Sequence, residues 1–158
     1  DYIENFKIGS NAEVWLDWGG IETLQSYGIV FEHEALLPSE KEEGSKKLRR
    51  IISEDQMAFL KSLDYAIEID EFFFCHAGVH PQMPLEKQSL KDLFLIREPF
   101  LSWPKPLSHM IVHGHTKTKG EPEVLPHRIN VDTGAYETGV MTAAVIEGNE
   151  ARFLQARL

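Results

Sequence analysis

Two short apolar runs, each followed closely by a histidine, constrain the fold of this chain most. Residues 72–75 read Phe-Phe-Phe-Cys and are followed by His76, and residues 110–112 read Met-Ile-Val and lead through His113 and Gly114 to His115. Short continuous apolar runs with abrupt ends are typical of fully buried strands. The sequence therefore predicts an α/β fold in which two buried strands end in histidine.

Helices are predicted before and between these strands. Glycines at 19–20 and 28 punctuate short helices near the start of the chain. Two capping-box patterns predict further helix starts, Ser39 with Glu42 for a solvated helix and Ser53 with Gln56 for a helix that packs on the core. Residues 90–100 predict a short helix that stops near Pro99.

The end of the chain is predicted to be strand. Residues 66–69 alternate ahead of the first apolar run, and residues 128–132, 140–147 and 151–155 have strand patterns. Gly148 and Asn149 suit a two-residue hairpin turn. An antiparallel sheet is therefore expected to close the chain.

Composition narrows the class of protein. A length of 158 residues with 42% apolar residues fits one globular domain or part of one. The net charge of −9 argues against extended polyanions such as nucleic acid as partners. No apolar stretch is long enough to cross a bilayer, and the single cysteine, Cys75, fits a buried thiol in a reducing compartment. A soluble, cytoplasmic protein is expected.

His76 and His115 are the candidate metal ligands. Neutral imidazole binds zinc-, iron- and manganese-class ions, and a ligand at the end of a buried strand is held rigidly. Two imidazoles are too few for a hydrolytic centre, so carboxylates or an amide must join them. His113 is expected to support the site and not to be a primary ligand. A structural, hydrogen-bonded role is predicted for the other four histidines, His33, His80, His109 and His127.

Two arginines lie among apolar residues. Arg97 either pairs with a structural carboxylate or binds an oxyanion through two parallel hydrogen bonds. For Arg128 an internal ion pair is the favoured prediction.

The order of the motifs resembles a known family. The succession runs from Trp-Gly-Gly at 18–20 through Cys-His-Ala-Gly-Val at 75–79 and Val-His-Gly-His-Thr at 112–116 to Asn-Val-Asp-Thr-Gly-Ala at 130–135. It resembles the phosphoprotein phosphatase branch of the metallophosphoesterases, and most closely the bacterial and phage serine/threonine protein phosphatases. The resemblance implies the calcineurin-like αββα sandwich.

The resemblance also implies site residues and cofactors. It makes His76 and His115 ligands of the second ion of a two-metal centre, and Arg97 a contact of the substrate phosphate. The ions are expected to be Mn²⁺, with Fe or Zn as alternatives. The implied reaction is in-line attack of hydroxide on a phosphate monoester such as phosphoserine or phosphothreonine, in a protein or in a small molecule.

Three motifs of that family do not occur in the chain: Gly-Asp-x-His, Gly-Asp-x-x-Asp-Arg-Gly and Gly-Asn-His-Glu. In the family they supply the remaining metal ligands and the general acid histidine, so no general acid is predicted here. The matching motifs span nearly the whole chain. Residues 1–158 are therefore expected to form the C-terminal part of one metallophosphoesterase domain, completed by an N-terminal segment.

Three other functions are left open. Symmetrical dinucleoside tetraphosphate hydrolases share the same motifs. The triplet Asp132, Thr133 and Gly134 also resembles the catalytic loop of dimeric aspartic proteases, but it leaves the strand-end histidines unexplained. A chain without the first half of a metal site could instead serve as a binding or scaffold domain, with a homo-oligomer partner covering its exposed sheet edge.

Overall fold

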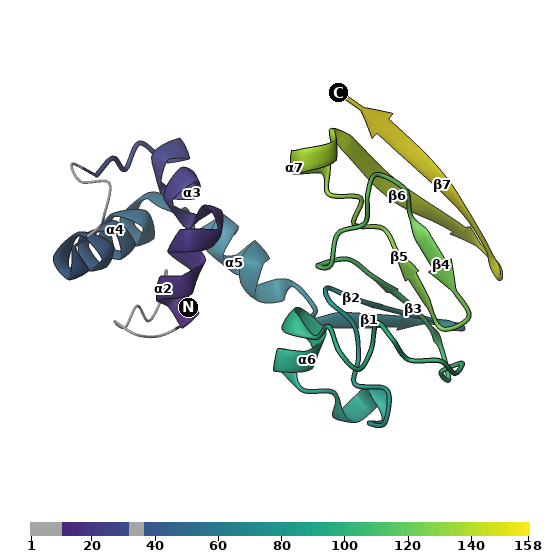
Figure 1. Ribbon diagram of the computed structural model, residues 1–158. Coiled ribbons are helices and arrows are strands. Elements are labelled where there is room, and N and C mark those ends of the chain that lie inside the picture. Colours follow the sequence, from purple (N-terminus) through teal and green to yellow (C-terminus); the bar gives the residue numbers. More distant parts are fainter. Residues whose placement is uncertain (1–10, 32–36) are drawn as a thin grey trace. The chain divides into compact units, whose positions relative to one another are not determined.

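A computed structural model describes residues 11–31 and 37–158. The chain divides into two compact units, residues 1–63 and residues 64–158, and each is described by itself. The elements are labelled in Figure 1. Among the described residues, no helix has the length and apolar character needed to span a membrane.

The first unit is helical. Helix α2 (Asn11–Trp15), a π-helical turn η1 (Leu16–Gly20) and α3 (Ile21–Ser26) follow one another. The predicted break at residues 19–20 is confirmed, because Trp18 and Gly19 leave helical conformation and Gly19 has a φ of 92°. Gly20 is required at its position, since an added Cβ would lie 2.6 Å from the Trp15 backbone oxygen and from its ring.

Helix α4 (Pro38–Ile51) has Leu37 as its N-cap, two residues before the predicted N-cap at Ser39. The capping box predicted there is wrong: the Leu37 backbone N–H donates instead to the Glu40 carboxylate at 2.8 Å, and Pro38 occupies the first helical position. Proline is favoured there because its missing N–H would have no helical partner. The helix is not wholly solvated, since Leu48 is 1% exposed in a core with Leu16, Leu24 and Ile29.

Helix α5 (Glu54–Ser62) starts as predicted. The Gln56 N–H donates to the Ser53 hydroxyl at 3.2 Å, and the Ser53 N–H donates to the Gln56 side chain at 3.0 Å. The prediction that α5 packs on the core is wrong, because none of its residues is buried and Phe59 is 62% exposed. The core of this unit is filled by Leu48 from α4 instead.

The second unit is built on a mixed five-stranded sheet. Its strands are β1 (Ala66–Ile69), β2 (Phe72–Cys75), β3 (Met110–His113), β5 (Arg128–Asn130) and β4 (Glu123–Leu125), in that spatial order. Strands β2, β3 and β5 run parallel, and the two edge strands pair antiparallel to their neighbours. The fold is therefore mixed α/β, as predicted at this level.

Both faces of the sheet are covered (Figure 1). On one face, helix α6 (Leu90–Leu95) and the chain after it pack Leu93, Ile96 and Phe100 against Phe73 and Ile111. On the other face, the hairpin of β6 (Val140–Glu147) and β7 (Glu150–Arg157) packs over Phe72, Val112 and Ile129. Alternation of side chains along β2 explains why Phe72 and Phe73 are buried in different cores.

Several predicted boundaries need correction. Helix α6 ends at Leu95, well before residue 100, because Ile96 leaves helical conformation and starts the turn to Phe100. Strand β2 is buried only at Phe72 and Phe73; Phe74 and Cys75 are partly exposed. The closing antiparallel sheet contains only β6 and β7, since β5 joins the larger sheet next to β3. The 148–149 hairpin turn is confirmed.

Three short elements were not predicted. They are the 3-10 helix η2 (Leu85–Lys87), strand β4 and helix α7 (Ala135–Thr138). Each is three or four residues long, which is too short for a hydrophobic period to be recognised in sequence.

Candidate functional site

The parallel pairing of β2 and β3 brings the two candidate ligands together. Phe74 lies opposite Val112 in the register, so both strands end at the same edge of the sheet. His76 follows β2, and His115 comes two residues after β3. The Gly114 N–H donates to the His76 carbonyl at 2.8 Å, and the two imidazole centroids are 5.1 Å apart. Crevices at the carboxyl ends of parallel strands are the usual ligand sites of α/β sheets.

His115 is held in an uncommon backbone conformation. Its φ is +66°, and the Thr116 N–H donates to the Gly114 carbonyl at 2.7 Å, which closes a γ-turn around it. A non-glycine residue in this region costs of order 1–3 kcal/mol and persists only where its surroundings fix it. Such residues concentrate at functional sites, so the turn makes His115 a candidate site residue.

The electrostatic environment keeps His115 neutral. Burial lowers the pKa of its imidazole, the Arg97 charge and the neighbouring His76 lower this pKa further, and Asp132 raises it. Its Nε2 atom is buried and has no hydrogen-bond partner in the described part of the chain. A neutral imidazole with an unused nitrogen is the form that binds a metal ion.

The spacing of the two rings suits shared ligation of one ion. A metal–nitrogen distance of about 2.1 Å puts each ring centroid roughly 3.2 Å from the ion, so two rings at about 90–110° would be roughly 4.6–5.3 Å apart. The observed 5.1 Å lies in that interval. Yet residues 11–31 and 37–158 hold no group of three or more His, Cys, Asp or Glu side chains able to bind a metal. The described residues thus bring together a pair of histidines with suitable spacing and no complete set of metal ligands.

A buried asparagine joins the loops around His115. Asn130 is 2% exposed; its amide donates to the Thr116 carbonyl at 2.7 Å and its side-chain oxygen accepts from the Asp132 N–H at 3.0 Å. The Asp132 carboxylate in turn accepts from the Gly134 N–H at 3.0 Å. Sequence reasoning missed Asn130, because a polar residue inside a three-residue strand gives no periodic signal.

Asp132 lies against the backbone of Gly114. A Cβ added to Gly114 would be 3.2 Å from the Asp132 Cβ. Glycine therefore lets the loop after β5 approach the turn that carries His115, which is a close approach that a larger residue would hinder.

Arg97 lies on the exposed chain after α6. Its backbone carbonyl accepts from the Leu101 N–H at 2.9 Å, and its charge is felt at His115. No carboxylate pairs with its guanidinium within the described residues. Of the two roles predicted for Arg97, the structural ion pair is thus not observed, and the side chain remains available to an oxyanion.

His113 is buried, and its ring nitrogens contact Gly114 and Arg128 and not His76 or His115. It is 2% exposed, and burial lowers the pKa of its imidazole to about 4. Its Nδ1 lies 3.0 Å from the Gly114 carbonyl and its Nε2 lies 3.4 Å from Arg128 Nη1. Arg128 forms the predicted internal ion pair, with Glu123 at 2.6 Å.

The other histidines lie away from the pair. His80 Nδ1 accepts from the Gln82 N–H, His109 contacts Ser108 and Glu68, and His127 is buried against Phe100. His33 lies outside the described residues. Cys75 is also unsuited to ligation, because burial raises the pKa of its thiol to about 12.

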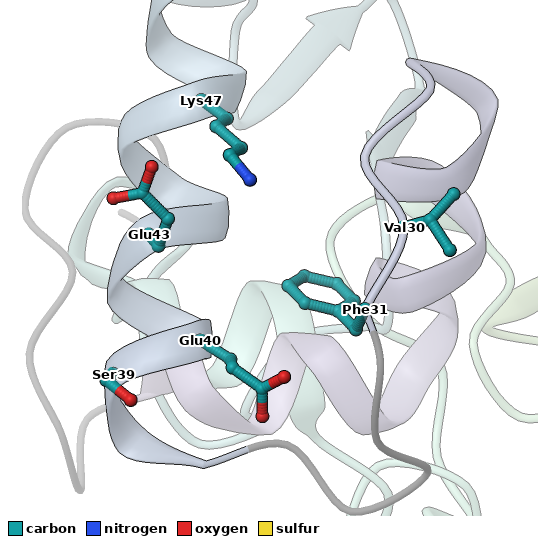
Figure 2. A pocket seen from close by; sticks show the side chains of 6 residues that line it. All are labelled: Val30, Phe31, Ser39, Glu40, Glu43 and Lys47. Carbon is teal, nitrogen blue, oxygen red and sulfur yellow. The ribbon is translucent and has the colours of Figure 1, made fainter.

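Cavities also lie away from the histidine pair in the described part of the protein. One of about 370 Å³ in the second unit is walled by proline, methionine and leucine side chains with Trp103 and Lys105. The other, of about 490 Å³, lies in the first unit, where Phe31 faces Glu40, Glu43 and Lys47 of α4 (Figure 2). Neither cavity is lined by His76 or His115. The pair of histidines at the end of β2 and β3 is the better candidate site, because its rings lie 5.1 Å apart and the Nε2 of His115 has no hydrogen-bond partner in the described part of the chain.

Comparison of the chain with protein-family models, with curated proteins and with solved structures found no match.

Proposed function

We propose that this chain provides part of the active site of a metal-dependent phosphoesterase that hydrolyses phosphate monoesters such as phosphoserine and phosphothreonine. The observation that carries the proposal is the His76–His115 pair, with ring centroids 5.1 Å apart at the ends of two parallel strands. The buried, unpartnered Nε2 of His115 and its φ of +66° support the same role. The order of motifs along the sequence adds the reaction type.

In this proposal His76 and His115 hold one divalent cation of a pair. The cations, Mn²⁺ first and Fe or Zn as alternatives, supply the positive charge that activates water and stabilises the phosphoryl transition state. Arg97 binds the non-bridging oxygens of the substrate phosphate through its guanidinium. Burial lowers the pKa of His115, which favours the unprotonated imidazole that binds a metal ion.

The proposal extends to the architecture. A sheet covered by α6 on one face and by the β6–β7 hairpin on the other is compatible with the C-terminal half of a calcineurin-like αββα sandwich. Residues 1–158 would then be the C-terminal part of one such domain in a cytoplasmic enzyme. The other metal ligands and the general acid would come from an N-terminal segment or from an oligomeric partner.

Metal titration of the chain tests the ligand assignment. We expect calorimetry with Mn²⁺ or Zn²⁺ to detect one weak site, which His76→Ala or His115→Ala abolishes. His109→Ala is the matched control, because His109 is half-buried but contacts only Ser108 and Glu68. Binding that survives both ligand substitutions, or two tight sites on the unaided chain, would refute the assignment.

Phosphatase assays test the reaction. Intact mass is measured first, and hydrolysis of p-nitrophenyl phosphate is then followed with Mn²⁺, with and without chelator. We expect little turnover by the 158 residues alone, and chelator-sensitive turnover once a segment carrying the three other family motifs is added. Arg97→Ala should then raise KM more than Arg97→Lys does. No turnover under either condition, together with a tight homodimer in sedimentation, would favour a binding or scaffold role.

The same complemented chain distinguishes the substrates. Phosphopeptides and symmetrical dinucleoside tetraphosphates are compared under identical conditions, and the larger kcat/KM identifies the substrate class. Acid-dependent peptide cleavage that Asp132→Asn removes, without any effect of chelator, would instead indicate an aspartic protease.

A further inference from the structure

The buried guanidinium of Arg128 contacts residues next to both parts of the candidate site, the turn at His115 and the turn that begins at Arg97. Arg128 opens β5 beside Ile111 of β3 and is only 4% exposed. Its Nη1 lies 2.6 Å from a Glu123 carboxylate oxygen and 3.4 Å from His113 Nε2, and its Nη2 lies 3.4 Å from the Leu101 carbonyl. Three chain segments that are distant in sequence therefore meet at this one side chain.

Stability alone does not explain a charge at this position. Removing a guanidinium from water costs several kcal/mol, and a buried ion pair is on average no more stabilising than apolar residues of similar size. Here the Nε of Arg128 is buried without a partner in the described part of the chain, and Glu123 is half-exposed. The directional contacts that Arg128 makes are thus the feature that an apolar side chain could not reproduce.

The first contact leads to the turn that carries His115. Arginine only donates hydrogen bonds, so the His113 Nε2 that faces it must accept, and the proton of the neutral ring is on Nδ1. Nδ1–H then donates to the Gly114 carbonyl at 3.0 Å. That carbonyl also accepts from the Thr116 N–H at 2.7 Å, so His113 and the γ-turn share one acceptor.

The second contact leads to the turn that carries Arg97. The Leu101 carbonyl accepts from Arg128, while the Leu101 N–H donates to the Arg97 carbonyl at 2.9 Å. Between them Phe100 is fully buried, with its ring edge-on to His113 at 4.9 Å. The start and the end of this turn are therefore fixed relative to the same network.

We propose that Arg128, anchored by Glu123, is a positioning residue that holds His115 through His113 and Gly114, and Arg97 through Leu101. It contacts neither substrate nor metal. The inference rests on the proposed function only for the roles of His115 and Arg97; the hydrogen-bond network can be tested without them. Outer residues that orient metal-binding histidines commonly change metal affinity 10- to 100-fold when they are replaced.

Amide hydrogen exchange in metal-free buffer tests the network. We expect Arg128→Met to accelerate exchange at Thr116 and Leu101 about tenfold or more relative to the other amides of β3 and β5. His113→Gln retains an acceptor for Arg128 but loses the donor to Gly114, so it should affect Thr116 alone. His113→Asn retains that donor and should leave Thr116 near wild type. Arg152→Met, at an exposed arginine with a long 4.0 Å ion pair, is the control and should change neither amide.

Mn²⁺ affinity then separates positioning from general destabilisation. Arg128→Met and His113→Gln should weaken Mn²⁺ binding by about 10- to 100-fold, and His113→Asn should restore most of it. If Arg128→Met does not fold, Glu123→Gln is measured in its place, because it removes the charge that anchors Arg128 at a half-exposed position that tolerates substitution. We expect it to accelerate exchange at Thr116 and Leu101 and to weaken Mn²⁺ binding in the same direction by a smaller factor, and no change in either would overturn the positioning role.

The two proposals fail in different ways. A wild-type chain that binds no Mn²⁺ but shows the expected exchange pattern would overturn the proposed function and leave the positioning network standing. A uniform acceleration of all amides in the unit, or unchanged exchange at Thr116 and Leu101 in a folded Arg128→Met variant, would overturn the positioning role.

Discussion

Replacing Gly78 with alanine should destabilise the second unit, because the new methyl group would collide with the core. Gly78 has a φ of +145°, and a Cβ there would lie 2.3 Å from Cδ1 and 2.4 Å from Cε1 of Phe100. Phe100 cannot easily move away, because its ring is fully buried and edge-on to His113 and His127 at 4.9 and 5.9 Å. The methyl group would therefore be forced into a closely packed core.

Two effects set the expected magnitude. A side chain in this backbone conformation costs roughly 1–2 kcal/mol, and overpacking a core adds roughly 1–3 kcal/mol. We expect Gly78→Ala to lower the free energy of unfolding by about 2–5 kcal/mol. Gly148→Ala is the matched control: its φ is +58° but nothing lies within 4 Å of the added Cβ, so only the backbone effect of roughly 1–2 kcal/mol applies.

Native-state hydrogen exchange of the Ile111 amide measures this loss. It reports on β3 of the second unit, whereas a single denaturation midpoint would average two compact units. Phe100→Leu makes room for the methyl group, so the double variant should be more stable than the sum of the single effects by about 1 kcal/mol or more. A Gly78→Ala loss no larger than that of Gly148→Ala, or strict additivity with Phe100→Leu, would refute the packing explanation.

Two further predictions concern pH and helix capping. In metal-free buffer, the free energy of unfolding should be highest above pH 6.5 and should fall by up to ~3 kcal/mol towards pH 4. The reason is that burial lowers the pKa of His113 from 6.5 to about 4, so that in this pH range the unfolded chain binds a proton that the folded chain does not. The charge of Arg128 lowers this pKa further, and Glu123 raises it. Chemical denaturation across that pH range measures the change in the free energy of unfolding, which should depend less on pH in the control variant His113→Phe. Ser53→Ala should destabilise helix α5 by about 1 kcal/mol, because the Ser53 hydroxyl accepts a hydrogen bond from the Gln56 N–H in the first turn. Ser39→Ala should cost close to nothing, because the α4 start is capped at Leu37 and Glu40. Amide exchange in the two helices distinguishes the variants, and equal losses would contradict the observed helix starts.

Local patterns predicted the elements that are stabilised by neighbouring residues. The Ser53 cap, the break at Gly19 and the hairpin at residues 148–149 depend on interactions within a few positions, and all three are confirmed. The Ser39 box failed because Pro38 and Glu40 favour an N-cap at Leu37, two residues earlier. Helix α6 ended early because Ile96 and Phe100 enter the core, a preference that no local pattern expresses.

Apolar residues alone did not predict what would be buried. The helix opened by Ser53 was predicted to pack on the core, yet the apolar side chains of Phe59, Leu60 and Leu63 are all exposed. Conversely, the polar residues Asn130 and Arg128 are almost completely buried. The internal ion pair of Arg128 was predicted, and its partner Glu123 lies only a few positions away in the sequence. Burial of Asn130 instead depends on the Thr116 carbonyl, which lies in a distant loop of the chain.

The positions of His76 and His115 after two apolar strands could be predicted from the sequence, since a strand and the residues after it are a local property. Three features depend on tertiary contacts: these strands are parallel neighbours, their histidine rings lie 5.1 Å apart, and His113 contacts Arg128. Alternation along a strand puts residues 113 and 115 on the same side only while the chain stays extended, and the γ-turn at His115 ends that extension. Strand pairing and buried hydrogen bonds join residues that are distant in sequence, so their geometry depends on the packing of the whole unit.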